Sequence, residues 1–208
     1  SALRSGEPSE RTAIMPVAPE LIVDDAARWR SWLDTHEDTS DGVWLVLAKK
    51  GTTAPTSLTY AQALDEALCS GWIDGRKQSR DAATFRQHFT PRRTRSMWSK
   101  RNVDHVARLT DEGRMRPRGA EEIARAHADG RWERAYEGSA AIEVPADLRA
   151  ALDAVPDAAR AFDALTKAER YSVLHPVVTA ATPATRAARI ARHVERLSAE
   201  SVLLTPEQ

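Results

Sequence analysis

Gly71–Asn102 reads GWIDGRKQSRDAATFRQHFTPRRTRSMWSKRN, and the rest of the 208-residue chain is organised around this stretch. It holds two of the six tryptophans and a dense run of arginines and lysines. Residues 76–118 contain 13 basic and 4 acidic side chains, a net charge of +9 in a chain whose total is zero. A field of that sign concentrates phosphate, carboxylate or nucleic acid. We therefore expect a binding site in or beside this stretch.

The same stretch carries the strand signals that decide the fold class. Residues 84–90 alternate Phe, Gln and Phe with Arg and His, which predicts a strand with one aromatic face that Pro91 closes. Residues 72–75 (WIDG) leave the preceding helix as a strand or a tight turn. The run VWLVLA at 43–48 is short, apolar and rich in β-branched side chains, which favours a buried strand. Together these segments predict a small sheet.

Helices are expected before and between the strands. Asp24 or Asp25 can cap a helix that places Ala26, Trp29 and Leu33 on one face. Thr59 and Gln62 have the spacing of a capping box, and Gly71 has the position of a left-handed helix terminator. The inward stripe of this second helix is predicted to be Ala61, Leu64 and Leu68.

The chain after residue 95 reads as helical. Ser96 or Ser99 can cap a helix that Gly113 ends, and Pro117 and Gly130 bracket the next one. Beyond Gly138 the composition is alanine-rich without tryptophan, and helices are predicted at 146–153, at 156–165, after a capping box at 166–169, and after Thr182-Pro183. The predicted fold class is α+β, with a flexible tail at 1–17, an α+β core at 18–138 and a helical region at 139–208.

The last of these helices is predicted to carry two stripes. The apolar one comprises Ala187, Ile190, Ala191, Val194 and Leu197, and we expect it to pack inward. The cationic one comprises Arg186, Arg189, His193 and Arg196. Such a stripe usually faces water, and the alternative is that it caps an anionic pocket or pairs with acids of the N-terminal part.

Composition and spacing exclude several classes of protein. Cys69 is the single cysteine, so an internal disulfide is impossible and a reducing compartment is expected. The sequence has no apolar run long enough for a membrane span and no signal-peptide pattern, so we expect a cytoplasmic protein. The histidines lack metal-ligand spacing, and neither a P-loop nor a dinucleotide-binding fingerprint is present. No metal or cofactor is predicted, and the oligomeric state is left open.

Short sequence words resemble the bacterial YdeI/OmpD-associated family (OmdA-like), also described as bacteriocin-protection proteins. The words are WRSWL (29–33), GVWL (42–45), ALCSGWIDG (67–75), FTPR (89–92), SMWS (96–99) with Asn102, GRM (113–115), Ala126, GRW (130–132) and TRAARI (185–190). The resemblance implies a small cytoplasmic bacterial protein linked to tolerance of bacteriocins or cationic antimicrobial peptides. It implies no particular reaction.

The leading functional hypothesis is a binding module for a small anionic ligand. Arginine suits this role because its planar fork takes two oxygens of one phosphate or carboxylate. A helix that starts near Ser99 would add backbone N–H groups, and two tryptophans could form a wall for a flat or apolar part of the ligand. The predicted site residues are Trp72, Asp74, Arg76, Arg92, Arg93, Ser96, Trp98, Ser99, Lys100 and Asn102.

Three other interpretations remain open at this point. The cations can be a solvated face and the tryptophans core residues. An enzyme could use Asp74 with His88 or His105 as an acid/base pair. The basic 76–118 stretch with its aromatic residues could bind single-stranded nucleic acid, although no nucleic-acid-binding motif is present, so this reading is not favoured.

Overall fold

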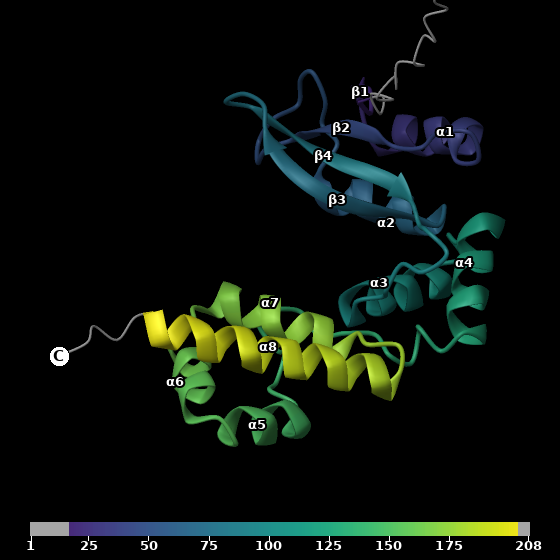
Figure 1. The fold of residues 1–208 in the computed structure, drawn as a ribbon. Coiled ribbons are helices and arrows are strands. Elements are labelled where there is room, and N and C mark those ends of the chain that lie inside the picture. The colour runs from purple at the N-terminus through teal and green to yellow at the C-terminus, as the bar shows by residue number, and fades with distance from the viewer. Residues whose placement is uncertain (1–16, 204–208) are drawn as a thin grey trace, which may run out of the picture. The chain divides into compact units, whose positions relative to one another are not determined.

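The computed structural model describes residues 17–203, and side chains as far as residue 200. The predicted α+β class is confirmed: a four-stranded sheet with helices is followed by a helical C-terminal region (Figure 1). The predicted tail at 1–17 lies, except for Val17, outside the described residues. The elements are β1 (Glu20–Leu21), α1 (Ala26–His36), β2 (Val43–Ala48), α2 (Tyr60–Cys69), β3 (Trp72–Ser79), β4 (Thr84–Pro91), α3 (Lys100–Asp111), α4 (Pro117–Ala128), α5 (Ala146–Asp153), α6 (Pro156–Ala164), α7 (Lys167–Val178) and α8 (Pro183–Leu203).

The chain divides into two compact units, each described separately below. Unit 1 comprises Ser1–Ala63 and Asp74–Pro91, and unit 2 comprises Leu64–Ile73 and Arg92–Gln208. The sheet therefore belongs almost wholly to unit 1, and the helices from α3 onward belong to unit 2.

The sheet has the strand order β1-β2-β4-β3. β2 runs antiparallel to β4, with Val43 opposite Phe89 and Ala48 opposite Thr84, and parallel to the short β1. All six residues of β2 are buried, which explains its continuous apolar sequence. At the turn between β3 and β4, the Asp81 carboxylate accepts hydrogen bonds from the backbone N–H groups of Ala83 and Thr84. The predicted strands are confirmed, and β1 is too short to leave a pattern in the sequence.

Trp29 joins α1 to the rest of unit 1. Its ring is fully buried, its indole N–H donates to the carbonyl of Ala63 at 3.1 Å, and the ring packs at 5.8 Å from Phe89 of β4. Asp25 is the N-cap, because its carboxylate accepts from the backbone N–H of Arg28. The expected inward face of this helix is thus confirmed at Trp29 and Leu33, both fully buried.

The capping box that opens α2 is confirmed in both directions. Thr59 donates its backbone N–H to the Gln62 side chain at 3.1 Å, and the Thr59 hydroxyl accepts from the Gln62 N–H at 3.3 Å. Gly71 ends this segment with a φ of +70°, where a Cβ would lie 2.9 Å from Glu122. Ala61 was wrongly assigned to the inward stripe, because it is exposed; alanine carries too little apolar area to decide between the alternative faces. The buried stripe is Ala63, Leu64, Ala67 and Leu68.

Local signals also set the ends of α3 and α4. Ser99, of the two serines considered, caps α3 by accepting from the backbone N–H of Asn102 at 3.2 Å. Gly113 follows this helix at a φ of +67°. Pro117 is the first residue of α4, and Gly130 follows it at a φ of +75°.

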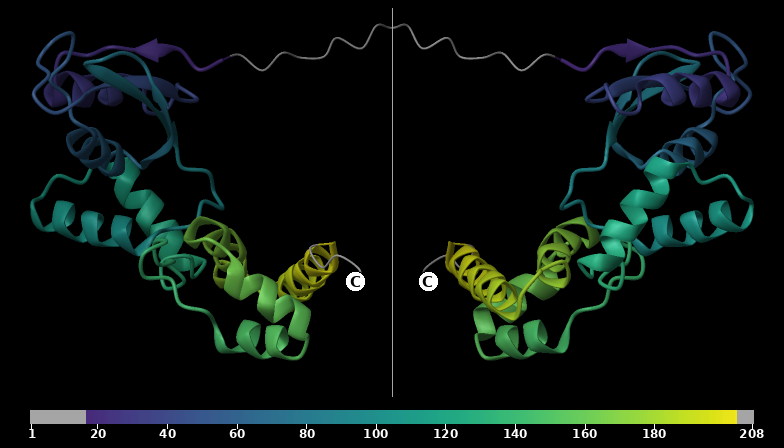
Figure 2. Two further views of the ribbon diagram at one scale, coloured as in Figure 1. Left: turned by 90° about the vertical axis from the view of Figure 1, so that its left-hand side faces the viewer. Right: turned by 90° about the vertical axis from the view of Figure 1, so that its right-hand side faces the viewer.

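The C-terminal helices gather beside α8, the long helix at the end of the described chain (Figures 1 and 2). Thr166 and Glu169 form the predicted capping box at the start of α7. The expected burial of Ile190 and Leu197 is confirmed, at 8% and 0% exposure. Ala187 and Ala191 are exposed instead, so the expected inward stripe is too wide. The core of this region is Leu148, Leu152, Ala158, Phe162, Val173, Leu174, Val177, Ile190 and Leu197.

None of the helices within residues 17–203 has the length and apolar character needed to cross a membrane.

Candidate anion-binding site

The residues predicted to form one pocket are distributed over both units. Asp74 and Arg76 belong to unit 1, and the other eight belong to unit 2. The Asp74 carboxylate accepts a hydrogen bond from the Tyr60 hydroxyl at 2.7 Å, and Arg76 is exposed. His88 packs against the Trp44 ring at 5.0 Å, and burial together with the charge of Arg76 lowers the pKa of its imidazole. The acid/base role considered for Asp74 stays a prediction.

Arg92 and Trp98 meet, and they do so in the interior of unit 2. The guanidinium carbon of Arg92 lies 3.5 Å from the centroid of the Trp98 ring, and the two residues are 5% and 1% exposed. Arg92 also donates to the carbonyl of Met97 at 3.4 Å, and the Trp132 ring packs at 4.9 Å from the Trp98 ring. Trp72 is fully buried. A cation stacked on an aromatic face stabilises the segment that contains both residues, whatever else they do.

Hydrogen bonds within the chain already use donor groups at the start of α3. The Ser99 hydroxyl accepts a hydrogen bond from the backbone N–H of Asn102, whose side chain is buried. The carbonyl of Tyr136 accepts one from the backbone N–H of Lys100. The Lys100 ammonium donates to Glu137 at 2.5 Å. These contacts satisfy two of the N–H groups that would otherwise favour an anion at a helix N-terminus.

Nearby, Ser96 and Arg93 form a turn. The Ser96 hydroxyl accepts the backbone N–H of Arg93, whose side chain is exposed. The carbonyl of Ser96 accepts from the guanidinium of Arg131 at 2.8 Å. The proposed part of these residues in ligand binding stays a prediction.

Acidic residues from other segments pair with much of the basic 76–118 stretch. In unit 1, Glu20 accepts from both Arg80 and Arg86. In unit 2, Asp65 pairs with Arg108 at 2.6 Å, and Glu66 pairs with Arg114 at 2.7 Å and with Arg116 at 2.8 Å. The excess of +9 counted along the sequence is therefore reduced in space, because the neutralising acids lie outside that stretch.

Glu66 and Arg116 are themselves buried, at 7% and 8% exposure. Arg116 also donates to the Ser70 hydroxyl and to the Glu66 carbonyl, which adds hydrogen bonds of the kind that a buried ion pair requires. Beside them, burial and the charge of Glu66 raise the pKa of the Cys69 thiol to about 11. This cysteine is a buried apolar residue rather than a reactive thiol.

A second group of basic side chains lines a hollow between α7 and α8, which we call the α7–α8 hollow. Its volume is about 430 Å³. Four of its six lining residues are arginine or histidine, and none is acidic. The lining residues are His175, Pro176, Thr179, Arg189, Arg192 and His193.

Three of the four residues in the cationic stripe predicted on α8 have partners within the chain. Arg186 donates hydrogen bonds to both carboxylate oxygens of Asp147, at 2.6 and 2.8 Å, and also donates to a carbonyl of α7. Arg189 donates to the carbonyl of Pro176 at 2.5 Å, near the C-terminal end of α7 where cations are favoured. Arg196 lies 3.7 Å from Glu200. The fourth residue of the predicted stripe, His193, lines the hollow.

Arg192 also lines the hollow, although the cationic stripe predicted from the sequence did not include it. Within the described residues it makes no ion pair and no hydrogen bond, and its side chain is exposed. The i, i+3 spacing from Arg189 is the signal that could have identified it.

Both histidines of the hollow are held toward the neutral form. Burial, followed by the charges of Arg196, Arg192 and Arg189, lowers the pKa of His193. Burial and the charge of Arg189 lower the pKa of His175, whose ring packs edge-on at 4.5 Å from Tyr136. An anion in the hollow would reverse the electrostatic part of these shifts. Over residues 17–203, no group of three or more His, Cys, Asp or Glu side chains is arranged to hold a metal ion.

Comparison with known families divides the chain in two. Residues 21–122 match a domain of unknown function, DUF8412. Residues 141–200 match the family described as "Bacteriocin-protection, YdeI or OmpD-Associated", which confirms the predicted resemblance for this region alone. Of the sequence words that suggested the resemblance, TRAARI (185–190) lies in the matched region, and those at 29–132 lie outside it. No curated protein and no solved structure matches the chain.

Proposed function

We propose that the protein binds a small phosphate- or carboxylate-bearing ligand in the α7–α8 hollow, which lies in the region that matches the YdeI/OmpD-associated family. The observation that carries the proposal is a basic hollow without an acid in its lining, in which Arg192 has no ion-pair partner among the described residues.

The chemistry of the hollow suits one compact anion. Arg192 can offer two parallel N–H donors to two oxygens of one ligand, a geometry that lysine cannot reproduce. His193 and His175 can each add a donor from a ring nitrogen once an anion favours their protonated form. Thr179 is a weaker candidate, because its hydroxyl already donates to the carbonyl of His175 at 2.8 Å.

The test is a calorimetric titration of the protein with inorganic phosphate and pyrophosphate at low ionic strength. Arg192→Ala should weaken the affinity by about 10- to 100-fold, the range expected for lost hydrogen bonds to a charged group. Arg196→Ala is the matched control for charge, because it removes the same charge from α8 without removing a donor that lines the hollow, and it should weaken the affinity less than Arg192→Ala does. Equal losses in both variants would mean that only the general field of α8 attracts the anion.

The residues predicted around Trp98 are the competing location for the same ligand. An anion whose affinity is unchanged in Arg192→Ala but reduced in Arg93→Ala would place the site there. Because Arg93 is exposed, that variant should stay folded.

The description of the matched family names bacteriocin protection, and we extend the proposal to that role in the cytoplasm. Bacteria expressing the parent chain should survive a bacteriocin challenge better than bacteria expressing Arg192→Ala at the same level. Equal survival would show that protection does not depend on anion binding by Arg192.

A further inference from the structure

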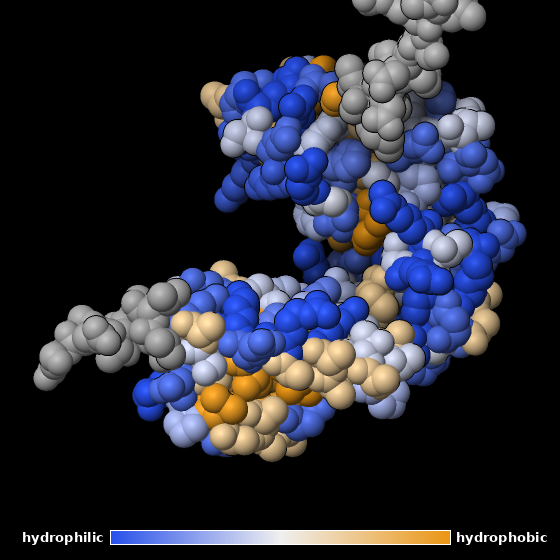
Figure 3. Space-filling model, in the orientation of Figure 1, coloured by the Kyte–Doolittle hydropathy of each residue, from blue (hydrophilic) through white to orange (hydrophobic). Residues whose placement is uncertain are grey.

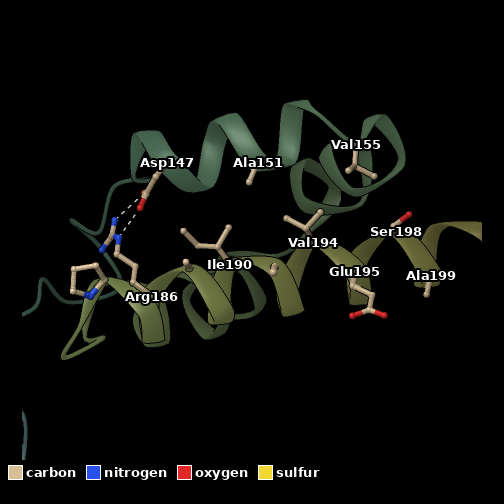
Figure 4. Close-up of a pocket in the computed structure, with 12 residues that line it drawn as sticks. Asp147, Ala151, Val155, Arg186, Ile190, Val194, Glu195, Ser198 and Ala199 are labelled. Carbon is tan, nitrogen blue, oxygen red and sulfur yellow. Dashed lines mark hydrogen bonds and ion pairs between the residues drawn. The ribbon is translucent and has the colours of Figure 1, made fainter.

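A second, apolar depression lies between α5 and α8; we call it the α5–α8 groove. Its volume is about 810 Å³. Apolar side chains gather over α5, α6 and α8 in Figure 3, below a band of hydrophilic ones. In Figure 4 the Asp147–Arg186 pair marks one end, and Glu195, Ser198 and Ala199 mark the other. The lining from α8 is Pro183, Arg186, Ala187, Ile190, Ala191, Val194, Glu195, Ser198 and Ala199, and α5 with the turn after it contributes Asp147, Ala151 and Val155.

The groove is shaped for a helix that approaches closely. Ala187 and Ala191 are exposed and leave only a methyl group on the surface of α8, and the half-buried Ala151 lines the α5 side. Two helices can pack at the short end of the usual 8–10 Å range where the contact residues are this small. Exposed alanines on an amphipathic helix are otherwise unexplained by the core that Ile190 and Leu197 join.

Glu195 supplies the charge that identifies the occupant. Its carboxylate makes no ion pair and no hydrogen bond within the described residues. Arg186 stands nine residues before it, which is two and a half turns, so the two side chains flank the groove face of α8 on opposite edges, about 13.5 Å apart along the helix axis. A helix that carries the same two charges in the opposite direction would match both ends of the groove.

We propose that the α5–α8 groove is filled by α8 of a second copy of this chain, packed antiparallel about a two-fold axis between positions 190 and 191. In that register, Arg186 of one copy faces Glu195 of the other. Ala187 faces Val194, and Ile190 faces Ala191. Each contact occurs twice, as a two-fold interface requires.

The complementarity lies in the chemistry of the pairs. The unpaired Glu195 of one copy meets Arg186 of the other, which also pairs with its own Asp147. The half-buried Val194 faces the methyl group of Ala187, and the exposed Ala191 faces the nearly buried Ile190, so the two helices can approach closely. Parallel packing in register would set Arg186 against Arg186 and Glu195 against Glu195, and like charges in contact are unfavourable. The residues involved are distinct from those of the α7–α8 hollow, so the two proposals stand independently.

The first test is the oligomeric state of the whole chain by sedimentation equilibrium over a range of concentrations. The parent should show a monomer–dimer equilibrium. Ala191→Arg should weaken the dimer by at least about 100-fold, because it places two like charges on the axis. Ala124→Arg adds the same charge at an exposed position of α4 and should leave the equilibrium unchanged. A parent that stays monomeric at the highest concentration, or a dimer that survives Ala191→Arg, would overturn the proposal.

The second test reads the register. Mixed Ala187→Cys and Val194→Cys proteins should form an intermolecular disulfide on oxidation, because these positions face each other. Ala187→Cys alone should not, since its two copies would lie about 10 Å apart along the helix axis. The native Cys69 is buried and should not compete. Crosslinking of Ala187→Cys with itself in preference to the mixture would exclude this antiparallel register.

Discussion

Two basic regions of the molecule differ in whether acidic side chains reach them. The acids Glu20, Asp65 and Glu66 lie outside the 76–118 stretch in the sequence and pair with five of its arginines: Arg80, Arg86, Arg108, Arg114 and Arg116. Along α8, the acids Asp147 and Glu200 pair with only part of the stripe. Arg192 is left beside two histidines. The lesson is that the number of cations in a segment does not measure its capacity to bind an anion; the cations left after internal pairing do.

The largest expected effect lies in the paired region. Glu66→Ala should lower the free energy of unfolding by about 3–5 kcal/mol, because it removes the carboxylate that pairs with the buried guanidinium of Arg116 and also removes a partner of Arg114. Urea unfolding of this variant beside Glu121→Ala, an exposed control on α4 expected to change stability by less than about 0.5 kcal/mol, measures the difference. Equal stability of the two variants would show that the pairing is dispensable.

The next prediction asks whether Arg92 belongs to the scaffold or to the site. Arg92→Ala should cost about 1–2 kcal/mol of stability, because it removes the cation from the buried Trp98 ring and a bond to Met97. Phosphate affinity should stay unchanged if the α7–α8 hollow is the site. Thermal unfolding and calorimetry on one preparation give both values, and a stable variant that has lost phosphate binding would instead favour the pocket predicted from the sequence.

A smaller effect should distinguish the α8 region by its pH dependence. The lowered pKa values of His175 and His193 mean that the folded chain takes up protons less readily than the unfolded one, so their contribution to stability falls as the pH drops below about 6.5. A bound anion favours the protonated rings, so sulfate, which stays a dianion over this range, should bind more tightly at pH 5.5 than at pH 8. His193→Gln should flatten this dependence when affinities are measured across that range; an unchanged profile would remove His193 from the site.

The smallest expected effect concerns Cys69, beside the Glu66 pair. With a thiol pKa of about 11, the folded protein should react with a thiol reagent at pH 8 far more slowly than the urea-unfolded chain. A chelator and a reducing agent should leave the melting temperature unchanged. Rapid labelling of the native protein would show that this part of unit 2 opens readily.

Local signals were sufficient for most of the elements. Thr59 with Gln62, Thr166 with Glu169, and Gly71 each act within a few residues, so their chemistry can be read directly from the sequence. The strand at Thr84–Pro91 was likewise visible, because alternation with a period of two reflects one buried face. The inward face of a helix was predicted less well where alanines define it, as Ala61, Ala187 and Ala191 show.

The sequence by itself determined the caps, the strand periods and the presence of a basic stretch, because each depends on neighbours in the chain. Only the tertiary structure decided which cations remain available. Glu20 reaches Arg80 across 60 positions, and Glu66 reaches Arg116 across 50, distances over which no local pattern extends. Electrostatic pairing depends on separation in space, which is why we propose the site in the hollow where Arg192 is left without an acid and not in the segment richest in arginine.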